Sequence, residues 1–233
     1  MRVLIISDAH ANIHPLKYVI QREKFDKIVF CGDAVDYGPN PGETLDLLKE
    51  NADVMVSGNH DYAAAYSVDC RCGEENHELS VFTRENITLK KLGKNDISFL
   101  RSLPNRMDME IDGMKFQVMH GSPRDELYGY MYPWSVQDHL RSMLGSPLDP
   151  ANYVVGHTHY QFLIRYAGNL VINPGSIGQP RDNPMPSYAV YDSSRNSVEF
   201  PRFDYDRSKL KEDIRSIISD QEILSGLYRL FSL

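Results

Sequence analysis

Apolar runs and amphipathic stretches alternate along the first sixty residues. Apolar residues recur at helical spacing over 13–23, where Asn12 is placed as the cap, and Pro41 opens a second predicted helix at 41–51. Three short apolar runs, rich in β-branched residues, predict buried strands of the parallel type at 2–7, 27–32 and 53–59. This β-α-β-α-β order predicts a doubly wound α/β half.

The second half of the chain returns to strand patterns after a less regular stretch. A hairpin is predicted over 106–121, because Asp112-Gly113 is typical of a two-residue turn. Helical stretches are predicted at 78–92 and 135–144. Further strands are predicted at 152–159, 161–176 and 187–200.

The C-terminal stretch from Asp206 onward predicts an amphipathic helix docked on the outside of the molecule. Its predicted apolar face consists of Leu210, Ile214, Ile217 and Ile218. Without an internal repeat or a low-complexity linker, residues 1–233 are predicted to form one domain. Residues 62–93 are predicted as a cap insertion over the strand ends, and 204–233 as a C-terminal helical extension.

Composition narrows the class of protein. The 233 residues are 42% hydrophobic and 24% charged, as in an ordinary globular protein. The net charge of −7 gives no general attraction to nucleic acid, so no stable nucleic-acid complex is expected. The chain lacks a run apolar enough to cross a bilayer, and its start turns polar too early for a signal peptide. With an odd count of three cysteines, these features predict a cytoplasmic protein that does not enter the membrane.

Five polar clusters follow predicted strands, where α/β sheets bind ligands. Each motif alone is weak, since a polar residue in a turn more often bonds to the local backbone. Together, however, the clusters hold five of the eight histidines. Their members are Asp8, His10, Asp33, Asp36, Asn59, His60, Asp61, His120, His157 and His159.

The residue types in these clusters favour metal binding. Histidine, aspartate and asparagine without thiolate suit divalent Mn, Fe, Ni, Co or Zn. Seven such ligands exceed the needs of one ion with an open position, so two ions sharing one carboxylate fit the count. In an extended chain, His157 and His159 would face the same point. That point could be one metal, two metals, a general base with its partner, or only a polar loop.

These motifs resemble a known family. The ordered set D-A-H, G-D-A-V-D, G-N-H-D, H-G and G-H-T-H, from Asp8 to His159, is similar to that of the calcineurin-like metallophosphoesterase superfamily. The later N-P-G-S-I-G-Q-P-R resembles a loop of its small bacterial and archaeal phosphodiesterase branch. The resemblance implies a four-layer α-β-β-α sandwich of two mixed β-sheets flanked by helices, with a small cap.

The resemblance also implies roles for individual residues. His60 would face the phosphate and assist the leaving group. Asp36 and Asp61 would either orient a histidine or asparagine ligand or bond only to their own turns, and Asp61 could instead polarise His60. Asn12 and Arg181 are further candidates, with Asn59 and His60, for contacts to substrate. The implied ligands are Asp8, His10 and His159 on the first metal, Asn59, His120 and His157 on the second, and Asp33 bridging. Manganese is the expected metal, with iron, nickel, cobalt and zinc as alternatives.

The implied activity is hydrolysis of phosphodiester or phosphomonoester bonds by a metal-bridging hydroxide. A small or nucleotide-like substrate is expected, and a homo-oligomer is compatible with the sequence. Tyr37 and Asp61 stand where protein serine/threonine phosphatases carry arginine and glutamate, which disfavours a phosphoprotein substrate.

Two alternatives remain open. A dinucleoside polyphosphate hydrolase would use aromatic residues to stack bases, although packing of the loop around Trp134 beneath the next helix is favoured. An inactive binding or scaffold protein on the same fold is disfavoured, because no ligand has been lost. Cys70 and Cys72 could bind metal or act as a redox switch, but the sequence favours ordinary reduced thiols.

Overall fold

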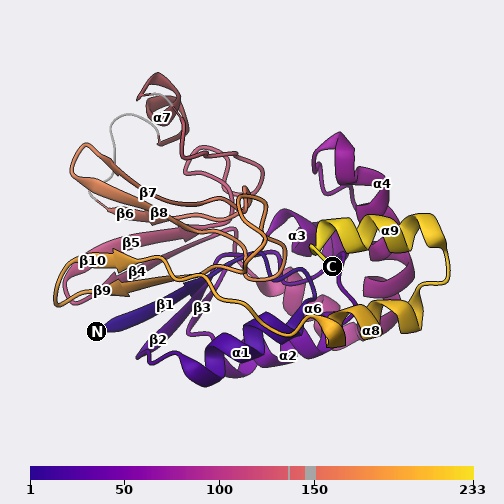
Figure 1. Ribbon diagram of the computed structural model, residues 1–233. Helices are drawn as coiled ribbons and strands as arrows, with labels where there is room; N and C mark the ends of the chain where they lie inside the picture. The colour runs from indigo at the N-terminus through magenta and orange to yellow at the C-terminus, as the bar shows by residue number, and fades with distance from the viewer. Residues whose placement is uncertain (136, 145–150) are drawn as a thin grey trace.

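Two five-stranded mixed sheets form the centre of the molecule (Figure 1). The structure is a computed structural model that describes residues 1–135, 137–144 and 151–233. Val136, inside the helical stretch predicted at 135–144, lies outside the described residues.

The first sheet has the strand order β10-β9-β1-β2-β3. β1, β2 and β3 run parallel, and β9 and β10 add antiparallel strands at one side. Leu4 of β1 lies beside Ile28 on one side and Val190 on the other. The bounds are β1 Arg2–Ile6, β2 Lys27–Phe30, β3 Val54–Met55, β9 Ala189–Asp192 and β10 Ser197–Glu199.

The second sheet has the order β4-β5-β6-β8-β7. The predicted hairpin is confirmed: Asp112 and Gly113 both have positive φ, at 47° and 82°, as a tight two-residue turn requires. The run predicted at 161–176 is two antiparallel strands. The bounds are β4 Arg106–Ile111, β5 Met114–Met119, β6 Asn152–Val154, β7 Gln161–Tyr166 and β8 Asn169–Pro174.

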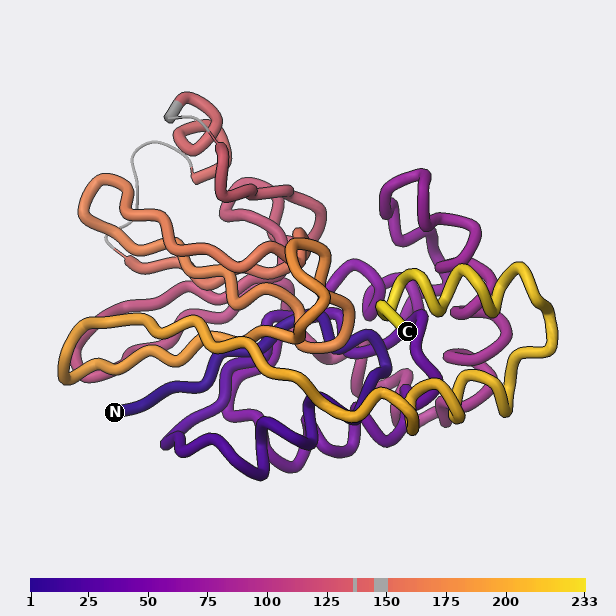
Figure 2. The backbone as a smooth tube through the Cα atoms, viewed as in Figure 1, coloured from indigo at the N-terminus to yellow at the C-terminus, as the bar shows by residue number. Residues whose placement is uncertain are grey.

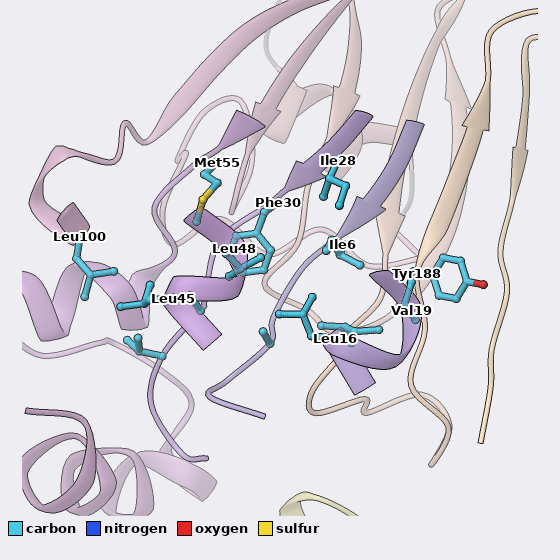
Figure 3. Packing of buried hydrophobic residues seen from close by; sticks show 14 of the residues in the cluster. Ile6, Leu16, Val19, Ile28, Phe30, Leu45, Leu48, Met55, Leu100 and Tyr188 are labelled. Atoms are coloured by element: carbon cyan, nitrogen blue, oxygen red, sulfur yellow. The ribbon is translucent and has the colours of Figure 1, made fainter. Parts of the chain in front are cut away.

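Alternation along β1 builds two apolar layers. Leu4 and Ile6 face the helices α1 (Ile13–Arg22) and α2 (Pro41–Asn51), whereas Val3 and Ile5 face the second sheet. Figure 3 shows the helix-facing layer, in which Leu16 and Leu48 pack beneath Ile6 and Phe30.

A third apolar layer covers the outer face of the second sheet. Leu140 and Leu144 of α7 (Gln137–Leu144) pack there with Tyr153 and Val171. Helices therefore flank both sheets, and the expected α-β-β-α arrangement is confirmed.

Most remaining helices lie at one end of the sheets, beside the strand ends (Figures 1 and 2). Leu210 and Ile214 of α8 pack with Tyr37 and Ile87 in a separate apolar cluster. The bounds are α3 Asn59–Tyr66, α4 Glu74–Thr83, π-helical η1 Arg84–Thr88, α5 Leu89–Lys91, α6 Lys94–Ser102, α8 Ser208–Ile217 and α9 Gln221–Leu230. None of the helices among the described residues has the length and apolarity to cross a membrane.

Three local predictions were wrong. Asn12 occupies the N-cap position of α1 as expected, but its side chain makes no capping bond; its amide nitrogen donates instead to the carbonyl of Gly178 and the hydroxyl of Tyr205. The strand expected at 53–59 spans two residues, and α3 begins at Asn59. Ile217 is 38% exposed, whereas Ile218 is buried because the chain leaves the helix there in an extended conformation.

Candidate metal centre

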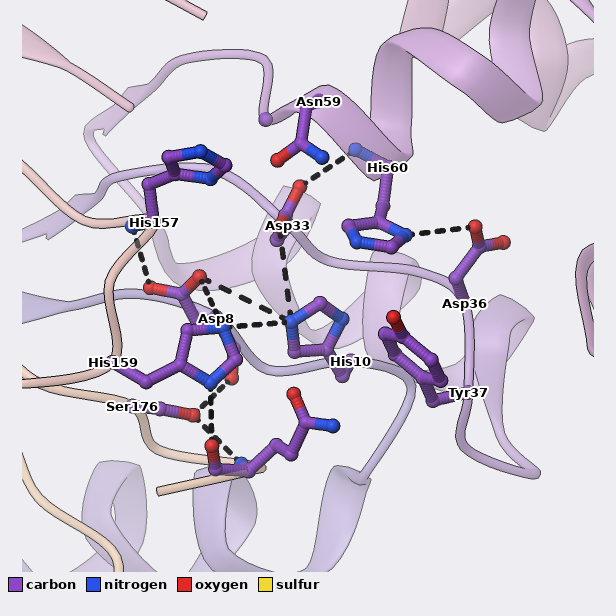
Figure 4. Close-up of polar contacts among 12 residues, drawn as sticks. Asp8, His10, Asp33, Asp36, Tyr37, Asn59, His60, His157, His159 and Ser176 are labelled. Carbon is purple, nitrogen blue, oxygen red and sulfur yellow. Dashed lines mark hydrogen bonds and ion pairs between the residues drawn. The ribbon is translucent and has the colours of Figure 1, made fainter. Parts of the chain in front are cut away.

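The five polar clusters converge at the carboxyl ends of the strands, and Figure 4 shows residues from four of them. They follow β1, β2, β3, β5 and β6, and parallel strands that end at one edge bring their following loops together. All seven residues implied as metal ligands are buried, and their donor atoms fall into two groups.

The first group consists of Asp8, His10 and His159. Oδ1 of Asp8 lies 3.1 Å from Nε2 of His159 and 4.0 Å from Nε2 of His10, and the two imidazole nitrogens are 3.2 Å apart. The other carboxylate oxygen of Asp8 accepts the backbone N–H of His157 at 3.3 Å. Oδ1 therefore remains free to bind a cation.

The second group surrounds Nε2 of His120. This nitrogen lies 3.2 Å from Oδ2 of Asp33, 3.1 Å from Oδ1 of Asn59 and 3.1 Å from Nδ1 of His157. The three atoms around Nε2 of His120 are thus oxygens or nitrogens able to bind a metal, and the residues that carry them are buried.

Asp33 joins the two groups. Its Oδ2 lies 3.2 Å from His120 Nε2 and also 3.7 Å from His10 Nε2. Its Oδ1 accepts the backbone N–H of His60 at 2.9 Å, which fixes the direction of the carboxylate. One oxygen of Asp33 consequently faces both groups.

Three imidazoles are held in the orientation that metal ligands need. Nδ1 of His10, His120 and His159 donates to the backbone carbonyls of Val35, Cys31 and Gln179, at 3.3, 2.7 and 2.5 Å. A proton on Nδ1 leaves the lone pair of Nε2 directed into the site.

The donor set fits a divalent cation. Asp8 Oδ1 is buried without a hydrogen-bond partner among the described residues, and an uncompensated buried carboxylate oxygen is costly. Burial lowers the pKa of His10 and His157 well below the ordinary value, and lowers that of His159 as well, so these rings are neutral, the form in which imidazole binds metal.

The pKa of His120 shifts in the opposite direction. Burial opposes its protonation, but the carboxylate of Asp33 outweighs this and raises the pKa of His120 to about 9. Burial also opposes the charge on Asp33, yet His120 and His60 hold its pKa well below the ordinary value. A proton on His120 therefore occupies the place where a cation would lie between these groups.

The backbone at the site is left-handed rather than extended. His157 and His159 have φ of 67° and 61°, so the extended geometry assumed for the G-H-T-H stretch was wrong. Asp8, His10 and Asp33 have φ of 55°, 45° and 61°. Each such residue costs about 1–3 kcal/mol, a strain that is typical of functional sites.

Close backbone packing explains the glycine of this stretch. A Cβ on Gly156 would lie 2.1 Å from Ser7 Oγ and 3.0 Å from Asp8 Oδ2. A larger residue there would have to displace Ser7 and would press on Asp8, so this position needs glycine.

Asp61 organises the loop after β2. Its carboxylate accepts the backbone N–H groups of Asp33, Ala34, Val35 and Gly58 at 2.8–3.2 Å. Burial and the charge of Asp33 raise the pKa of Asp61 to about 7, and the N–H donors oppose this rise. Backbone bonding was one of the alternatives that the sequence left open for Asp61, and these contacts also position Asp33.

His60 is oriented by Asp36, which the sequence offered as an orienting residue, and by two residues that the sequence did not assign. Its Nδ1 lies 3.0 Å from Oδ2 of Asp36 and 3.3 Å from the hydroxyl of Ser80. Arg84 donates to the same oxygen of Asp36 at 3.1 Å. Ser80 and Arg84 belong to the segment expected as a cap, and no motif spacing indicates that they reach the site.

The two further substrate candidates lie differently. Asn12 is fully buried and bonds to Gly178 and Tyr205, so it holds the loop that carries Gln179. Arg181 is exposed and makes no hydrogen bond or ion pair with a described residue. Its charge contributes to lowering the pKa of His10, His157 and His159, and it follows two residues after Gln179, whose carbonyl accepts from His159.

Aromatic rings extend from the site to the surface. Tyr130 packs on His157 with ring centroids 4.0 Å apart, and Tyr132 stacks on Tyr130 at 6.0 Å and on Trp134 at 4.8 Å. Trp134 is 61% exposed. The favoured prediction, that this loop packs beneath the next helix, was therefore wrong for Trp134.

Comparisons with known proteins agree with this geometry. A family model described as the calcineurin-like phosphoesterase superfamily domain matches residues 1–196. An uncharacterized protein of Methanocaldococcus jannaschii is 32% identical, over 91% of each chain. A probable metallophosphoesterase of Mycoplasma pneumoniae is 27% identical, over 88% of this chain and 98% of its own length.

A solved structure gives the same picture. The crystal structure of a metallophosphoesterase from Sphaerobacter thermophilus matches with a TM-score of 0.80 and 31% identity, over 97% of this chain and 98% of that chain. The matched regions include both donor groups, from Asp8 to His159.

Proposed function

The chain belongs to the calcineurin-like phosphoesterase superfamily, whose members depend on metal, and we propose on this premise that it hydrolyses phosphodiester or phosphomonoester bonds. The expected substrate is small or nucleotide-like. The intact set of seven donors argues against an inactive scaffold on the same fold.

One observation carries the proposal: Oδ2 of Asp33 faces two groups of metal donors at once. Asp8, His10 and His159 would hold one ion, Asn59, His120 and His157 the other, and Asp33 both. Manganese is the metal that we expect, with iron, nickel, cobalt and zinc as alternatives, because the donors are oxygen and nitrogen atoms. Two such ions, when bound, supply an activated water and neutralise phosphoryl charge.

His60 would protonate the leaving oxygen. Asp36 binds Nδ1, which leaves Nε2 as the nitrogen able to donate a proton, and Figure 4 shows that side of the ring facing Asp33 and His10. Burial opposes a charge on His60, but Asp33 and Asp36 outweigh it and raise the pKa of His60 to about 9. The imidazolium is therefore the form present near neutral pH.

Arg181 would bind the substrate phosphate. It is an exposed guanidinium near both donor groups and makes no ion pair with a described residue. Guanidinium groups bind phosphate oxygens with paired hydrogen bonds. Asn12 and Asp61 would act indirectly, by fixing the loops that carry Gln179 and Asp33.

The proposal is tested by metal reconstitution. Protein stripped of metal is loaded with manganese, iron, nickel, cobalt or zinc and assayed on bis-p-nitrophenyl phosphate, p-nitrophenyl phosphate and a panel of nucleotides and dinucleotides. Activity that appears with metal and disappears with a chelator supports the function. Absence of activity on every substrate with every metal would overturn the proposed function.

The aromatic rings favour one second candidate, a dinucleoside polyphosphate hydrolase. Tyr132 and Trp134 are stacked and lead outward from His157, and such faces bind nucleobases. Chromatography of the products from dinucleoside polyphosphates distinguishes this candidate from a general diesterase. Equal rates on substrates with and without bases would exclude it.

A further inference from the structure

Cys70 and Cys72 form a close thiol pair in the loop between α3 and α4. Their Sγ atoms lie 2.7 Å apart. Arg71 between them has a left-handed backbone with φ of 51°, which folds the loop so that both side chains converge. Cys70 is fully buried and Cys72 is partly exposed, so only one thiol of the pair is open to solvent.

The cysteine loop contacts the metal centre through its backbone. Nδ2 of Asn59 donates to the carbonyl of Cys70 at 2.8 Å. This bond fixes the amide of Asn59 so that its Oδ1 lies 3.1 Å from Nε2 of His120. Movement of the backbone at Cys70 would therefore turn a metal ligand.

A second contact passes through Ser80. Its hydroxyl lies 3.4 Å from Sγ of Cys70 and 3.3 Å from Nδ1 of His60. Cys70 is thus linked to Asn59 through its backbone carbonyl and to His60 through the hydroxyl of Ser80.

A disulfide fits this pair better than a third metal. Ligand atoms of His60, Cys70 and Cys72 lie within 4.8 Å of one another and could surround a soft cation. However, Nδ1 of His60 is already bonded to Asp36, and the guanidinium of Arg84 lies 3.5 Å from Ser80 Oγ beside the thiols. A fixed positive charge there repels a cation, whereas it favours thiolate chemistry.

We propose that Cys70 and Cys72 are a modification site, at which a peroxide forms a reversible disulfide that slows the phosphoesterase. Cys72, the accessible thiol, attacks the peroxide oxygen, which breaks the O–O bond and gives a sulfenic acid and water. The sulfur of Cys70 then attacks the sulfur of Cys72. Hydroxide leaves with the proton of the Cys70 thiol, as water. Two thiols and one hydrogen peroxide thus become one disulfide and two waters.

The disulfide constrains the segment that holds Asn59. A covalent S–S bond of about 2.05 Å is shorter than the 2.7 Å between the two Sγ atoms, so closing a ring over Cys70, Arg71 and Cys72 shifts the backbone carbonyl of Cys70 away from Asn59 and removes the thiol that faces Ser80. Loss of a partner that orients a metal ligand lowers activity or metal affinity by about 10- to 100-fold.

The bond itself is tested by peptide mapping, without any activity. Trypsin cleaves after Arg71, so Cys70 and Cys72 fall in separate fragments, 50–71 and 72–84, while Cys31 falls in 28–49. The protein is treated with hydrogen peroxide, unfolded, alkylated and digested. We expect the first two fragments to be joined, or recovered uncut and lighter by two hydrogens, with Cys31 alkylated.

Two other outcomes of the mapping would overturn the proposal. Both cysteines could be alkylated or singly oxidised without a link between them, or a link could join either one to Cys31. Dithiothreitol should restore the separate alkylated fragments, and failure to do so would show that the change is not reversible.

The activity effect rests on the proposed function and is measured separately. Peroxide should lower turnover about tenfold or more, and dithiothreitol should restore it. Cys72→Ser should keep the reduced activity and resist peroxide, because no disulfide can form. If the fragments are linked but the protein is inactive in every state, the proposed phosphoesterase function is wrong and the disulfide is supported. If the protein is active but peroxide inhibits it and Cys72→Ser equally, the proposed redox inhibition is wrong, whereas the phosphoesterase function stands.

Discussion

Asp36 accepts a hydrogen bond from His60: Oδ2 of the carboxylate lies 3.0 Å from Nδ1 of the imidazole, and both side chains are buried. This contact fixes the proton on Nδ1 and the orientation of the ring. Together with the charge of Asp33, it explains how a histidine outside both donor groups can keep a positive charge in a buried site.

Replacing His60 should separate acid catalysis from metal binding. His60→Ala should keep both ions, because no donor atom of either group is removed. Turnover should fall by about 10²–10⁴-fold on alkyl esters, which need a proton at the leaving oxygen, and less on p-nitrophenyl esters. Metal analysis and a comparison of leaving groups check this. An equal loss on all esters would contradict the acid role.

Removing one ligand from each group should reveal two separate ions. His157→Ala should bind one manganese in place of two and lose more than about a hundredfold in activity, since a ligand matters at least as much as its outer partner. His159→Ala should lose the other ion, and Asp33→Ala should weaken both. Titration calorimetry with elemental analysis gives the count. Two ions in His157→Ala would argue against the assignment.

Metal binding should release a proton. The pKa of His120 is raised to about 9 without a cation, so His120 is protonated at neutral pH and must lose that proton to bind metal. Affinity at the second position should therefore rise with pH by about tenfold per unit, and level off above about pH 9. Calorimetry in two buffers of different ionisation enthalpy measures the proton count. A count of zero would contradict this prediction.

Asp61→Asn should destabilise the fold. The carboxylate accepts four backbone N–H groups in a buried site, and an amide offers only one acceptor oxygen to them. We expect a loss of about 3 kcal/mol in the free energy of unfolding, measured with urea. Asp53→Asn is the matched control, because exposed Asp53 accepts a single N–H, from Ile28, and should lose about 1 kcal/mol or less. Equal effects of the two substitutions would show that the amide cluster contributes little.

Arg181→Ala should weaken substrate binding more than chemistry. The KM for a phosphodiester should rise about tenfold with little change in kcat, because an exposed guanidinium adds binding to the phosphate. The effect should shrink at high salt, which screens exposed charges. Arg124→Ala is the control, since Arg124 lines a surface cleft with Tyr62 and Tyr128 whose lining includes none of the seven donor residues. A similar KM for both variants would remove Arg181 from the site.

The local pattern of apolar and polar residues was sufficient to predict the helices and strands with strong periodicity. The alternation of apolar runs and amphipathic helices predicted β1, α1, β2 and α2 in order, and Asp112-Gly113 predicted its hairpin. Weak patterns failed: α6 was not predicted, because its short amphipathic stretch follows directly on a longer helical one. Asn12 resembled a cap because capping preferences are local, whereas its partners Gly178 and Tyr205 are more than 160 residues away.

The sequence by itself identified the candidate residues for the proposed chemistry. Motif order and donor types identified seven candidate ligands, since metal preference depends on the chemical nature of the side chain. Which donors meet was decided by tertiary structure. Left-handed backbone at His157 and His159, the sharing of Asp33, and the pairing of Asp36 with His60 all depend on contacts between loops far apart in the chain. Such contacts form only when parallel strands bring their ends together, so no local pattern can record them.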